Sequence, residues 1–158
     1  MKTFLEPGCG SGLISLYAAQ KGAIVTATDI NPVAVEFIKK NSRKNQLSLT
    51  VIQSDLFENI PSERFDIIAI NPPYYKKRPV SAKDYAWFCG ENGEYFEALF
   101  KKLNNYVHNS SEVYMVLFEG CDQEMIKNHA SGNGFNLSLV QTHKNFLEKN
   151  FIYKIEKS

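Results

Sequence analysis

The sequence has few of the residues that build covalently linked or metal-held scaffolds. Its three cysteines, Cys9, Cys89 and Cys121, are far apart, and none belongs to a Cys-x-x-Cys pair. The three histidines show no spacing typical of metal ligands. An odd and scattered set of cysteines argues against both a disulfide framework and a zinc site. We therefore predict no bound metal and a reducing cytoplasm as the protein's location.

The sequence also lacks an excess of charge of one sign and any long apolar run. The chain has 18 lysines and arginines and 17 aspartates and glutamates, so its formal net charge is +1. No global field draws such a chain to nucleic acid, and basic attraction must be local. No apolar run reaches about 18 residues, and the N-terminus has no charged-then-apolar leader. These absences predict a soluble protein with no membrane partner, and 158 residues predict a single domain spanning 1–158.

Strand-like and helix-like segments alternate along the chain. Predicted strands cover residues 2–6, 23–29, 47–53, 65–70 and 112–118. Predicted helices cover residues 11–21, 32–44, a stretch from Asn92 onward, and 122–131. Asn31 suits the N-cap of the second helix because Pro32 takes the first helical position. The third helix shows one apolar stripe, formed by Phe96, Leu99, Phe100, Leu103 and Val107.

The last two predicted strands cover residues 135–145 and 150–157, with a turn near Leu147–Lys149. This order of elements predicts an α/β fold with a Rossmann-like, doubly wound, mostly parallel seven-stranded sheet. Helices are expected on both faces, and an antiparallel C-terminal hairpin on one edge. In such sheets ligands bind outside the carboxyl ends of the strands.

Glycines and an acid follow the first predicted strand. Glu6 precedes a Gly-x-Gly-x-Gly pattern formed by Gly8, Gly10 and Gly12. Glycines permit positive φ and let a ligand lie against bare backbone, and the following helix points its amides at the loop. The spacing differs from the dinucleotide fingerprint, and no lysine follows as in a P-loop. Glu6 would repel phosphate but could hold an ammonium, which favours an amino-acid-bearing nucleoside.

Two further acids end the next two predicted strands. Asp29 lies roughly 20 residues past the glycines, where an acid can accept both hydroxyls of a ribose. Asp55 ends the third strand, where a carboxylate can accept from an exocyclic adenine amine. Asp29 could instead help Asn31 cap the helix, and Asp55 could start a turn. Three acids at three successive strand ends favour an adenosine ligand.

The fourth predicted strand leads into Asn71-Pro72-Pro73-Tyr74. With "FLEPGCGSG", "ATDINPVAVEFIKKN" and "QSDLF" before it, this motif makes residues 3–75 resemble the class I S-adenosylmethionine-dependent methyltransferases that carry an NPPY motif. Within them the chain is most similar to the HemK-type release-factor glutamine methyltransferases, because "AWFCGENGEYFEALFKKL" repeats their Gly-x-x-Gly loop and long helix.

The resemblance implies an enzyme that uses S-adenosylmethionine as its cofactor. The implied cofactor-binding residues are Glu6, Pro7, Gly8, Cys9, Gly10, Gly12, Asp29, Ile30, Asn31, Ser54, Asp55, Leu56 and Asn71. The implied catalytic residues are Asn71, Pro72, Pro73 and Tyr74.

The chemistry of a planar –NH₂ group explains why a strand would end in this motif. The Asn71 side-chain oxygen and the Pro72 carbonyl can hold the two hydrogens and aim the nitrogen lone pair at a methyl donor. Pro72 and Pro73 fix φ and add no competing N–H, and Tyr74 offers a face for stacking. Catalysis is then mostly proximity and orientation. The alternative is a proline-rich strand exit with a buried aromatic plug.

The residues after the motif leave the acceptor open. Lys76, Lys77 and Arg78 could hold phosphates of RNA or DNA, could hold acidic patches on a protein, or could form a solvated loop. The aromatic residues nearby could form an acceptor-side lid or pack under the loop; they are Tyr75, Tyr85, Trp87 and Phe88. Cys89 takes a position where the glutamine methyltransferases often have a small glycine.

The sequence begins at the first predicted strand, whereas the family carries a covering helix before it. We therefore expect the N-terminal helix of the family to be absent, and a partner or a missing N-terminal segment to cover the exposed sheet face. Three functions stay open. The chain could methylate a glutamine amide of a protein such as a release factor, methylate N6 of adenine in RNA or DNA, or serve as a non-catalytic cofactor-binding subunit.

Overall fold

A computed structural model describes residues 1–144 and 148–158 of the chain. The chain forms two compact units. The first contains Met1–Ala69 and Asn105–Ser111, and the second contains Ile70–Asn104 and Glu112–Ser158. The expectation of a single domain spanning 1–158 stays a prediction.

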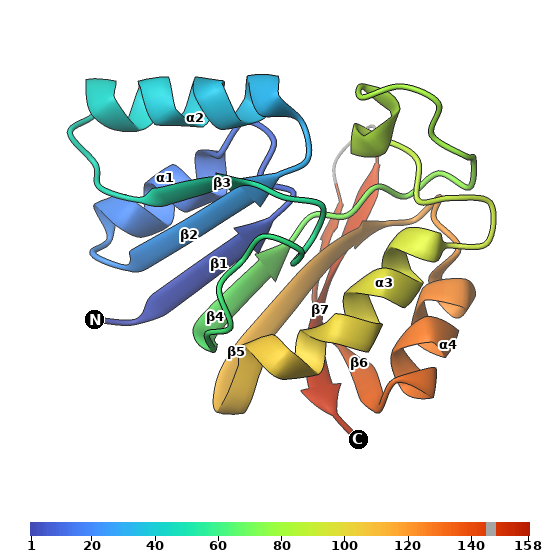
Figure 1. The fold of residues 1–158 in the computed structure, drawn as a ribbon. Coiled ribbons are helices and arrows are strands. Elements are labelled where there is room, and N and C mark those ends of the chain that lie inside the picture. Colours follow the sequence, from blue (N-terminus) through green and yellow to red (C-terminus); the bar gives the residue numbers. More distant parts are fainter. Residues whose placement is uncertain (145–147) are drawn as a thin grey trace. The chain divides into compact units, whose positions relative to one another are not determined.

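Strands and helices alternate as predicted (Figure 1). The described elements are β1 (Thr3–Pro7), α1 (Leu13–Gln20), β2 (Ile24–Asp29), α2 (Pro32–Lys44), β3 (Thr50–Gln53), β4 (Phe65–Ile70), the 3-10 turn η1 (Asp84–Ala86), α3 (Glu94–Leu103), the 3-10 turn η2 (Asn104–Tyr106), β5 (Val107–Phe118), α4 (Gln123–Gly132), β6 (Phe135–Lys144) and β7 (Lys149–Lys157). Over the described residues the strand order is β3-β2-β1-β4-β5-β7-β6 in a seven-stranded sheet. The predicted fold class is confirmed, and Leu147 of the expected hairpin turn lies outside the described residues.

Parallel strands form the sheet of the first unit. β1 pairs with β2 and β4, and β2 pairs with β3, all in parallel register. Leu5 of β1 lies opposite Ile68 of β4, and both side chains are fully buried. Phe57 stacks on Tyr106 with ring centroids 4.5 Å apart, and the Tyr106 hydroxyl donates to the Phe57 carbonyl. Figure 1 shows α2 lying alongside β3 in this unit.

The helix starts in the first unit follow from local backbone chemistry. The Asn31 side chain accepts from the Val33 N–H at 3.0 Å, and Pro32 opens α2, as predicted. α1 begins at Leu13 rather than at residue 11, because Gly12 has a left-handed φ of 71° that no helix contains. A Cβ at Gly12 would lie 2.5 Å from the side chain of Ile38, so only glycine fits between α1 and α2.

Further predicted boundaries were wrong, and one is the start of β5, which begins at Val107 instead of residue 112. β3 begins at Thr50 instead of Leu47, because the Leu47 N–H is donated to the Ser42 carbonyl at the end of α2. α3 ends at Leu103, and Val107 is the first residue of β5 instead of the last of the helical stripe. Val107 is buried in β5, so it is apolar because of strand packing and not because it belongs to the stripe of α3.

The second unit combines antiparallel strands with two packed helices. β7 pairs antiparallel with both β5 and β6, which confirms the predicted antiparallel edge. Asp122 caps α4 by accepting from the Met125 N–H at 3.0 Å. His129 of α4 contacts the Asn92 carbonyl through Nε2 at 2.9 Å, which ties α4 to the loop before α3. In the described part of the chain, no helix is long and apolar enough to cross a bilayer.

Candidate functional site

The glycine loop after β1 leaves open space above its backbone. Gly8, Gly10 and Gly12 all have left-handed φ values, of 70°, 50° and 71°. A Cβ built at Gly8 or Gly10 would meet no atom within 4 Å, and both residues are exposed. The Cys9 N–H donates to the Thr28 carbonyl at 2.8 Å and fixes the loop to β2. A ligand can therefore lie directly against this backbone.

Asp29 joins the glycine loop to the start of α2. Its side chain is buried, with Oδ2 accepting from the Gly10 N–H and Oδ1 from the Asn31 N–H, both at 2.8 Å. The alternative that Asp29 supports the helix start is thus present in the structure. Each carboxylate oxygen has a second lone pair, so both can still accept a hydroxyl. The ribose-binding role stays a prediction that this geometry permits.

Glu6 holds the first turn of α1. Its Oε2 accepts from the Ser15 N–H at 2.9 Å and also from the Ser15 hydroxyl, and both side chains are buried. Burial raises the pKa of Glu6 to about 7, although the bonds from Ser15 oppose this shift. Sequence reasoning assigned Glu6 to a ligand ammonium and missed Ser15. The available signal was a serine flanked by apolar residues in the first turn of α1.

Cys9 is a packing residue of the loop. Its side chain is buried and packs in one cluster with Ala27 and Ile38. Burial, with the nearby Asp29 carboxylate, raises the pKa of the Cys9 thiol well above its usual range. The thiol stays protonated and is a poor nucleophile, in agreement with the interpretation of Cys9 as a small residue between glycines.

The end of β3 forms a tight turn that displays Asp55. Ser54 is buried, donates its N–H to the Asp29 carbonyl at 2.9 Å, and accepts from the Asn59 N–H through Oγ at 3.0 Å. Leu56 follows with a φ of 46°, and Asp55 between them is exposed. Contact of Asp55 with an adenine amine stays a prediction.

Hydrogen bonds thus join most of the predicted cofactor-binding residues of the first unit into one rim. Asp29 bonds to Gly10, Asn31 and Ser54, so the residues following β1, β2 and β3 are linked. Pro7 is buried as the last residue of β1, and Ile30 is half-buried beside Asp29. Open glycine backbone beside buried acids suits a nucleoside that carries an amino acid, and the residues present therefore fit the expected cofactor.

The NPPY motif opens the second unit. Asn71 directly follows β4 and is exposed, while Pro72 and Pro73 are buried. The Tyr74 hydroxyl donates a hydrogen bond to Asn71 Oδ1. The Tyr74 ring packs edge-on against Phe118, with centroids 5.1 Å apart and planes at 62°. Burial raises the pKa of Tyr74 to about 12, so the hydroxyl keeps its proton at neutral pH.

This bond changes the role expected of Tyr74. Sequence reasoning gave its ring a stacking role, and a contact of the hydroxyl with Asn71 was not foreseen. A carboxamide oxygen has two lone pairs, so one remains for an incoming N–H. Donation by Tyr74 also fixes which way the carboxamide is turned, because only its oxygen can accept the hydroxyl hydrogen. The spacing of three residues, with two prolines of fixed φ between, was the signal for this pairing.

The loop that follows is held by its own backbone. The Tyr75 N–H donates to the Trp87 carbonyl and the Cys89 N–H to the Tyr75 carbonyl, both at 2.9 Å. The Gly90 N–H donates to the Lys77 carbonyl at 3.2 Å. The buried Cys89 thiol lies 3.4 Å from the Tyr75 carbonyl. The loop is therefore a bridged element that keeps its shape.

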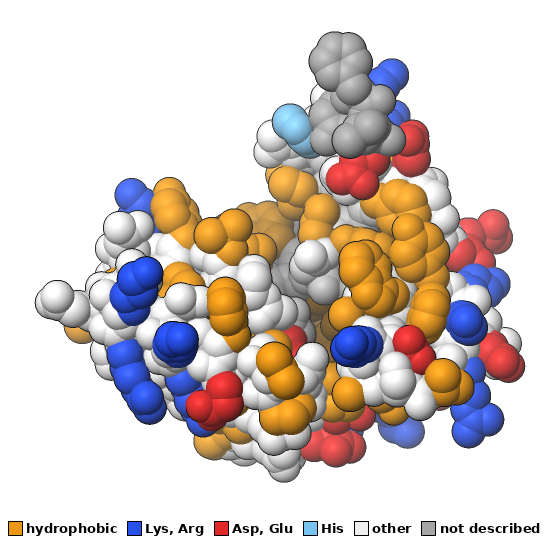
Figure 2. All heavy atoms as spheres, turned by 90° about the horizontal axis from the view of Figure 1, so that it is seen from above, with side chains coloured by type: hydrophobic (Ala, Val, Ile, Leu, Met, Phe, Trp, Pro, Cys, Tyr) orange, Lys and Arg blue, Asp and Glu red, His pale blue; other side chains and the backbone are white. Residues whose placement is uncertain are grey.

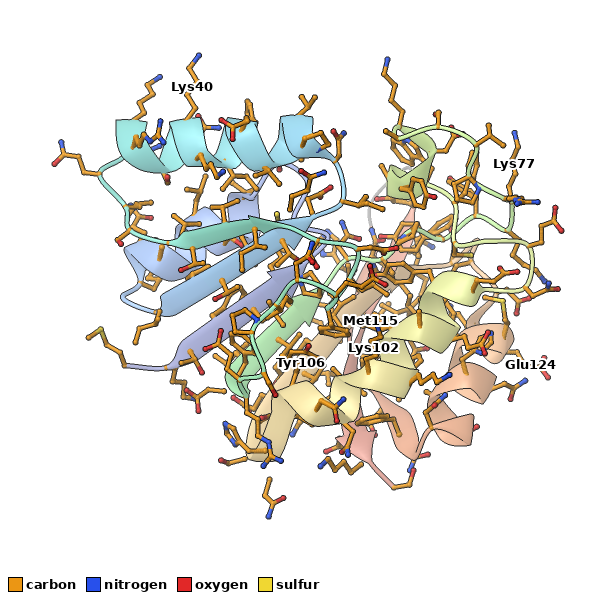
Figure 3. The ribbon with its side chains drawn as sticks, viewed as in Figure 1. Lys40, Lys77, Lys102, Tyr106, Met115 and Glu124 are labelled. Atoms are coloured by element: carbon orange, nitrogen blue, oxygen red, sulfur yellow. The ribbon has the colours of Figure 1, made fainter. Side chains whose placement is uncertain are left out.

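The cations of this loop differ in their surroundings. Lys76 pairs with Asp122 at 3.0 Å. The Lys77 ammonium lies 5.0 Å from the centroid of the Phe88 ring, and Figure 3 shows its side chain projecting from the loop. Arg78 is exposed, with no ion pair among the contacts of the described residues. The three adjacent cations are therefore not equivalent.

Comparison with known proteins matches the methyltransferase small domain family to residues 1–117. A protein named "Putative protein N5-glutamine methyltransferase" from Methanocaldococcus jannaschii is 36% identical over 121 residues, which are 73% of this chain and 61% of that protein. A release factor glutamine methyltransferase of Rhodopirellula baltica is 32% identical over 74% of this chain and 44% of its own length. A tRNA1(Val) (adenine(37)-N6)-methyltransferase of Shewanella loihica is 39% identical over 51% of this chain and 37% of its own length.

The chain spans between 37% and 61% of the length of these three relatives. Among solved structures, a methyltransferase from Pyrococcus furiosus superposes with a TM-score of 0.74 at 19% identity. The match covers 97% of this chain and 74% of that one, and it supports the fold described above.

Proposed function

Since the chain belongs to the methyltransferase small domain family, we propose that it transfers a methyl group from S-adenosylmethionine to a planar –NH₂ group. The single observation that carries the acceptor chemistry is the Asn71 carboxamide, whose oxygen is oriented by the Tyr74 hydroxyl at the exit of β4. Relatives named for glutamine and for adenine both act on nitrogens of this kind.

The rim of the first unit would hold the methyl donor. The Gly8 and Gly10 backbone offers a surface free of side chains, and Asp29 has lone pairs left for two ribose hydroxyls. Glu6 would face the ammonium, which favours its ionised form against the effect of burial. S-adenosylmethionine, when bound, supplies an electrophilic methyl on a positively charged sulfur.

Asn71 and Pro72 would hold the acceptor. The Asn71 oxygen accepts one N–H of the acceptor through its second lone pair, and the Pro72 carbonyl accepts the other. The acceptor nitrogen would bond to the methyl carbon as the bond from that carbon to the sulfonium sulfur breaks, leaving S-adenosylhomocysteine, and the nitrogen would then lose one proton to water, so no side chain need act as a base. Tyr74 stays protonated and keeps the carboxamide oriented, because its pKa is raised to about 12. Orientation of this kind contributes up to roughly 7–11 kcal/mol in favourable cases.

We propose that the acceptor is a glutamine side chain of a protein such as a translation release factor. The two glutamine-methylating relatives match over 73% and 74% of this chain, whereas the tRNA adenine relative matches over 51%. A formal charge of +1 also gives little general attraction for nucleic acid. N6 methylation of adenine is the second candidate, because the Asn71 geometry serves an exocyclic amine equally well.

One experiment separates these functions. The protein is incubated with S-adenosylmethionine labelled in its methyl group and with release factor, RNA or DNA in turn, and the labelled residue is identified by mass spectrometry. Label on a glutamine amide supports the proposal, and label on adenine supports the second candidate. Binding of S-adenosylhomocysteine with no transfer to any acceptor would indicate a non-catalytic subunit and overturn both.

A further inference from the structure

Residues 75–90, named here the docking loop, display large apolar side chains to solvent. The exposed fractions are 48% for Tyr75, 84% for Val80, 44% for Tyr85 and 59% for Trp87. Single exposed apolar residues are common, but several gathered in one short loop indicate an interaction site. Tryptophan and tyrosine, with arginine, are also the residues that contribute most of the affinity at protein interfaces.

The docking loop holds these side chains in a fixed frame. The Asp84 carboxylate accepts from the Val80 N–H at 2.9 Å and from the Ser81 N–H at 3.0 Å. The Trp87 N–H donates to the Asp84 carbonyl at 2.9 Å, and the Trp87 carbonyl accepts from Tyr75. A surface ordered before binding loses less conformational entropy when a partner arrives.

The charge of the docking loop indicates the chemistry of that partner. Four cations, Lys76, Lys77, Arg78 and Lys83, stand against one acid, Asp84, which gives the loop a formal charge of +3. Asp84 already holds backbone N–H groups, and Lys76 is paired with Asp122. Arg78 and Lys83 are exposed and leave the loop complementary to acidic groups.

A protein fits this surface better than a nucleic acid does. A duplex-binding protein that makes about 6–10 phosphate contacts needs more cations than the four exposed ones of this loop supply. The most exposed apolar residue of the loop is Val80, which stacks no base but contacts an apolar side chain well. The right-hand half of Figure 2 shows hydrophobic side chains gathered together with a lysine or arginine at their margin.

We propose that the docking loop binds the protein acceptor through a segment that combines an apolar side chain with acidic residues. Trp87 and Tyr85 would contact the apolar group, and Arg78 and Lys83 the acids. This inference rests on the proposed function, because it names the surface that recruits the acceptor carrying the glutamine.

The test measures steady-state methylation of release factor by Trp87→Ala and by the charge reversal Arg78→Glu. Matched controls on the same unit are Leu139→Ala, which removes a side chain 55% exposed on β6, and Lys101→Glu, which reverses an exposed charge on α3. We expect Trp87→Ala to raise the KM for release factor at least 10-fold and Arg78→Glu about 5-fold. The kcat, the Kd for S-adenosylhomocysteine and both control variants should stay within two-fold of the unaltered protein.

Two outcomes would overturn the docking proposal. One is a KM for release factor in Trp87→Ala and Arg78→Glu that matches the controls. The other is a loss of RNA methylation in these variants with protein methylation unchanged. Direct binding of release factor, measured by calorimetry with S-adenosylhomocysteine present, separates this proposal from the proposed function. Suppose that release factor binds, that Trp87→Ala weakens this binding, and that no methylation occurs. This result would contradict the proposed function and support the docking proposal.

Discussion

In the first unit, buried acids at the strand ends accept mainly backbone N–H groups, whereas in the second unit the side chain at the strand end is oriented by another side chain. Asp29 and Glu6 are buried, and their carboxylates accept backbone N–H groups of Gly10, Asn31 and Ser15. Asn71 is exposed, and its oxygen is oriented by a side chain, Tyr74. The arrangement in the first unit depends on where the backbone places its N–H groups. The arrangement in the second unit depends on the identity of the two side chains, Asn71 and Tyr74.

This contrast suits a donor that is always the same and an acceptor that varies. A rim built from backbone can hardly change without refolding, so it serves a constant ligand. A carboxamide and an exposed loop can change by single substitutions, which agrees with a family whose relatives are named for glutamine and for adenine. The variants that follow test whether donor binding and acceptor handling are separable in this way.

Asn71→Ala should have the largest effect on transfer. It removes the oxygen that accepts from the acceptor nitrogen, and loss of one such oriented group commonly costs about 10²–10³-fold in rate. We expect this fall in kcat, measured with labelled donor, and a Kd for S-adenosylhomocysteine within a few-fold of the unaltered protein. Loss of donor binding together with transfer would show that Asn71 supports the first unit, and the contrast would fail.

Asp29→Ala should weaken donor binding, in contrast to Asn71→Ala, which should slow transfer. It removes two predicted ribose contacts and also leaves the Gly10 and Asn31 N–H groups without their acceptor. We expect the Kd for S-adenosylhomocysteine to rise roughly 30–100-fold, with about 1–3 kcal/mol lost from the free energy of unfolding. Asp29→Asn keeps the size of the side chain and one acceptor oxygen. Its Kd for S-adenosylhomocysteine should therefore lie between those of the unaltered protein and Asp29→Ala. An unchanged Kd with a lower kcat would contradict the assignment.

Tyr74→Phe should lower kcat about 10-fold while leaving donor affinity unchanged. The ring and its contact with Phe118 persist, but nothing then decides which end of the Asn71 carboxamide faces the acceptor. Tyr75→Phe is the matched control, because Tyr75 also packs edge-on against Phe118, at 5.7 Å, and bonds nothing on Asn71. Equal kcat values for the two variants would show that the Tyr74 hydroxyl has no orienting role.

Glu6→Gln should change the pH dependence of stability. Burial raises the pKa of Glu6 from 4.5 to about 7, so between these values the folded state binds more protons than the unfolded state. The stability of the unaltered protein therefore falls as pH rises from about 4.5 to 7. Glutamine can keep the bonds from Ser15 without titrating. We expect the variant to be more stable at pH 8 by roughly 1–3 kcal/mol, measured by urea unfolding.

Parallel pH profiles for the two proteins in that experiment would show that Glu6 does not titrate in this range. Ser15→Ala serves as the control, since it removes one of the bonds that favour the ionised form of Glu6. Its stability should go on falling to a higher pH than that of the unaltered protein, because loss of this bond raises the pKa of Glu6 further. Its affinity for S-adenosylhomocysteine should fall by a few-fold.

Features set by local backbone chemistry were predictable from the sequence. Asn31 and Pro32 supplied two separate reasons to place a helix start here, a side-chain cap and a fixed φ. α2 does begin at Pro32. The glycine loop was recognised for the same reason, because positive φ restricts the choice of residue. The apolar stripe located α3 but not its end, since periodicity alone could not tell that Val107 is buried in a strand.

Features that depend on side-chain direction left only indirect signals in the sequence. The Tyr74 hydroxyl could have pointed at solvent, a ligand or Asn71, and in the structure it donates to Asn71 while its ring packs against Phe118. Ser15 reaches Glu6 because α1 starts after a left-handed glycine, which turns its first residues toward β1. Such pairings arise from tertiary packing and leave no periodic trace in the sequence.

The sequence contains one tryptophan, Trp87, which lies in the docking loop and is 59% exposed. All indole emission from this chain therefore reports on one neighbourhood. If a protein binds the docking loop as proposed, burial of that ring would shift its fluorescence to shorter wavelength, so recruitment could be followed in real time without attaching a dye.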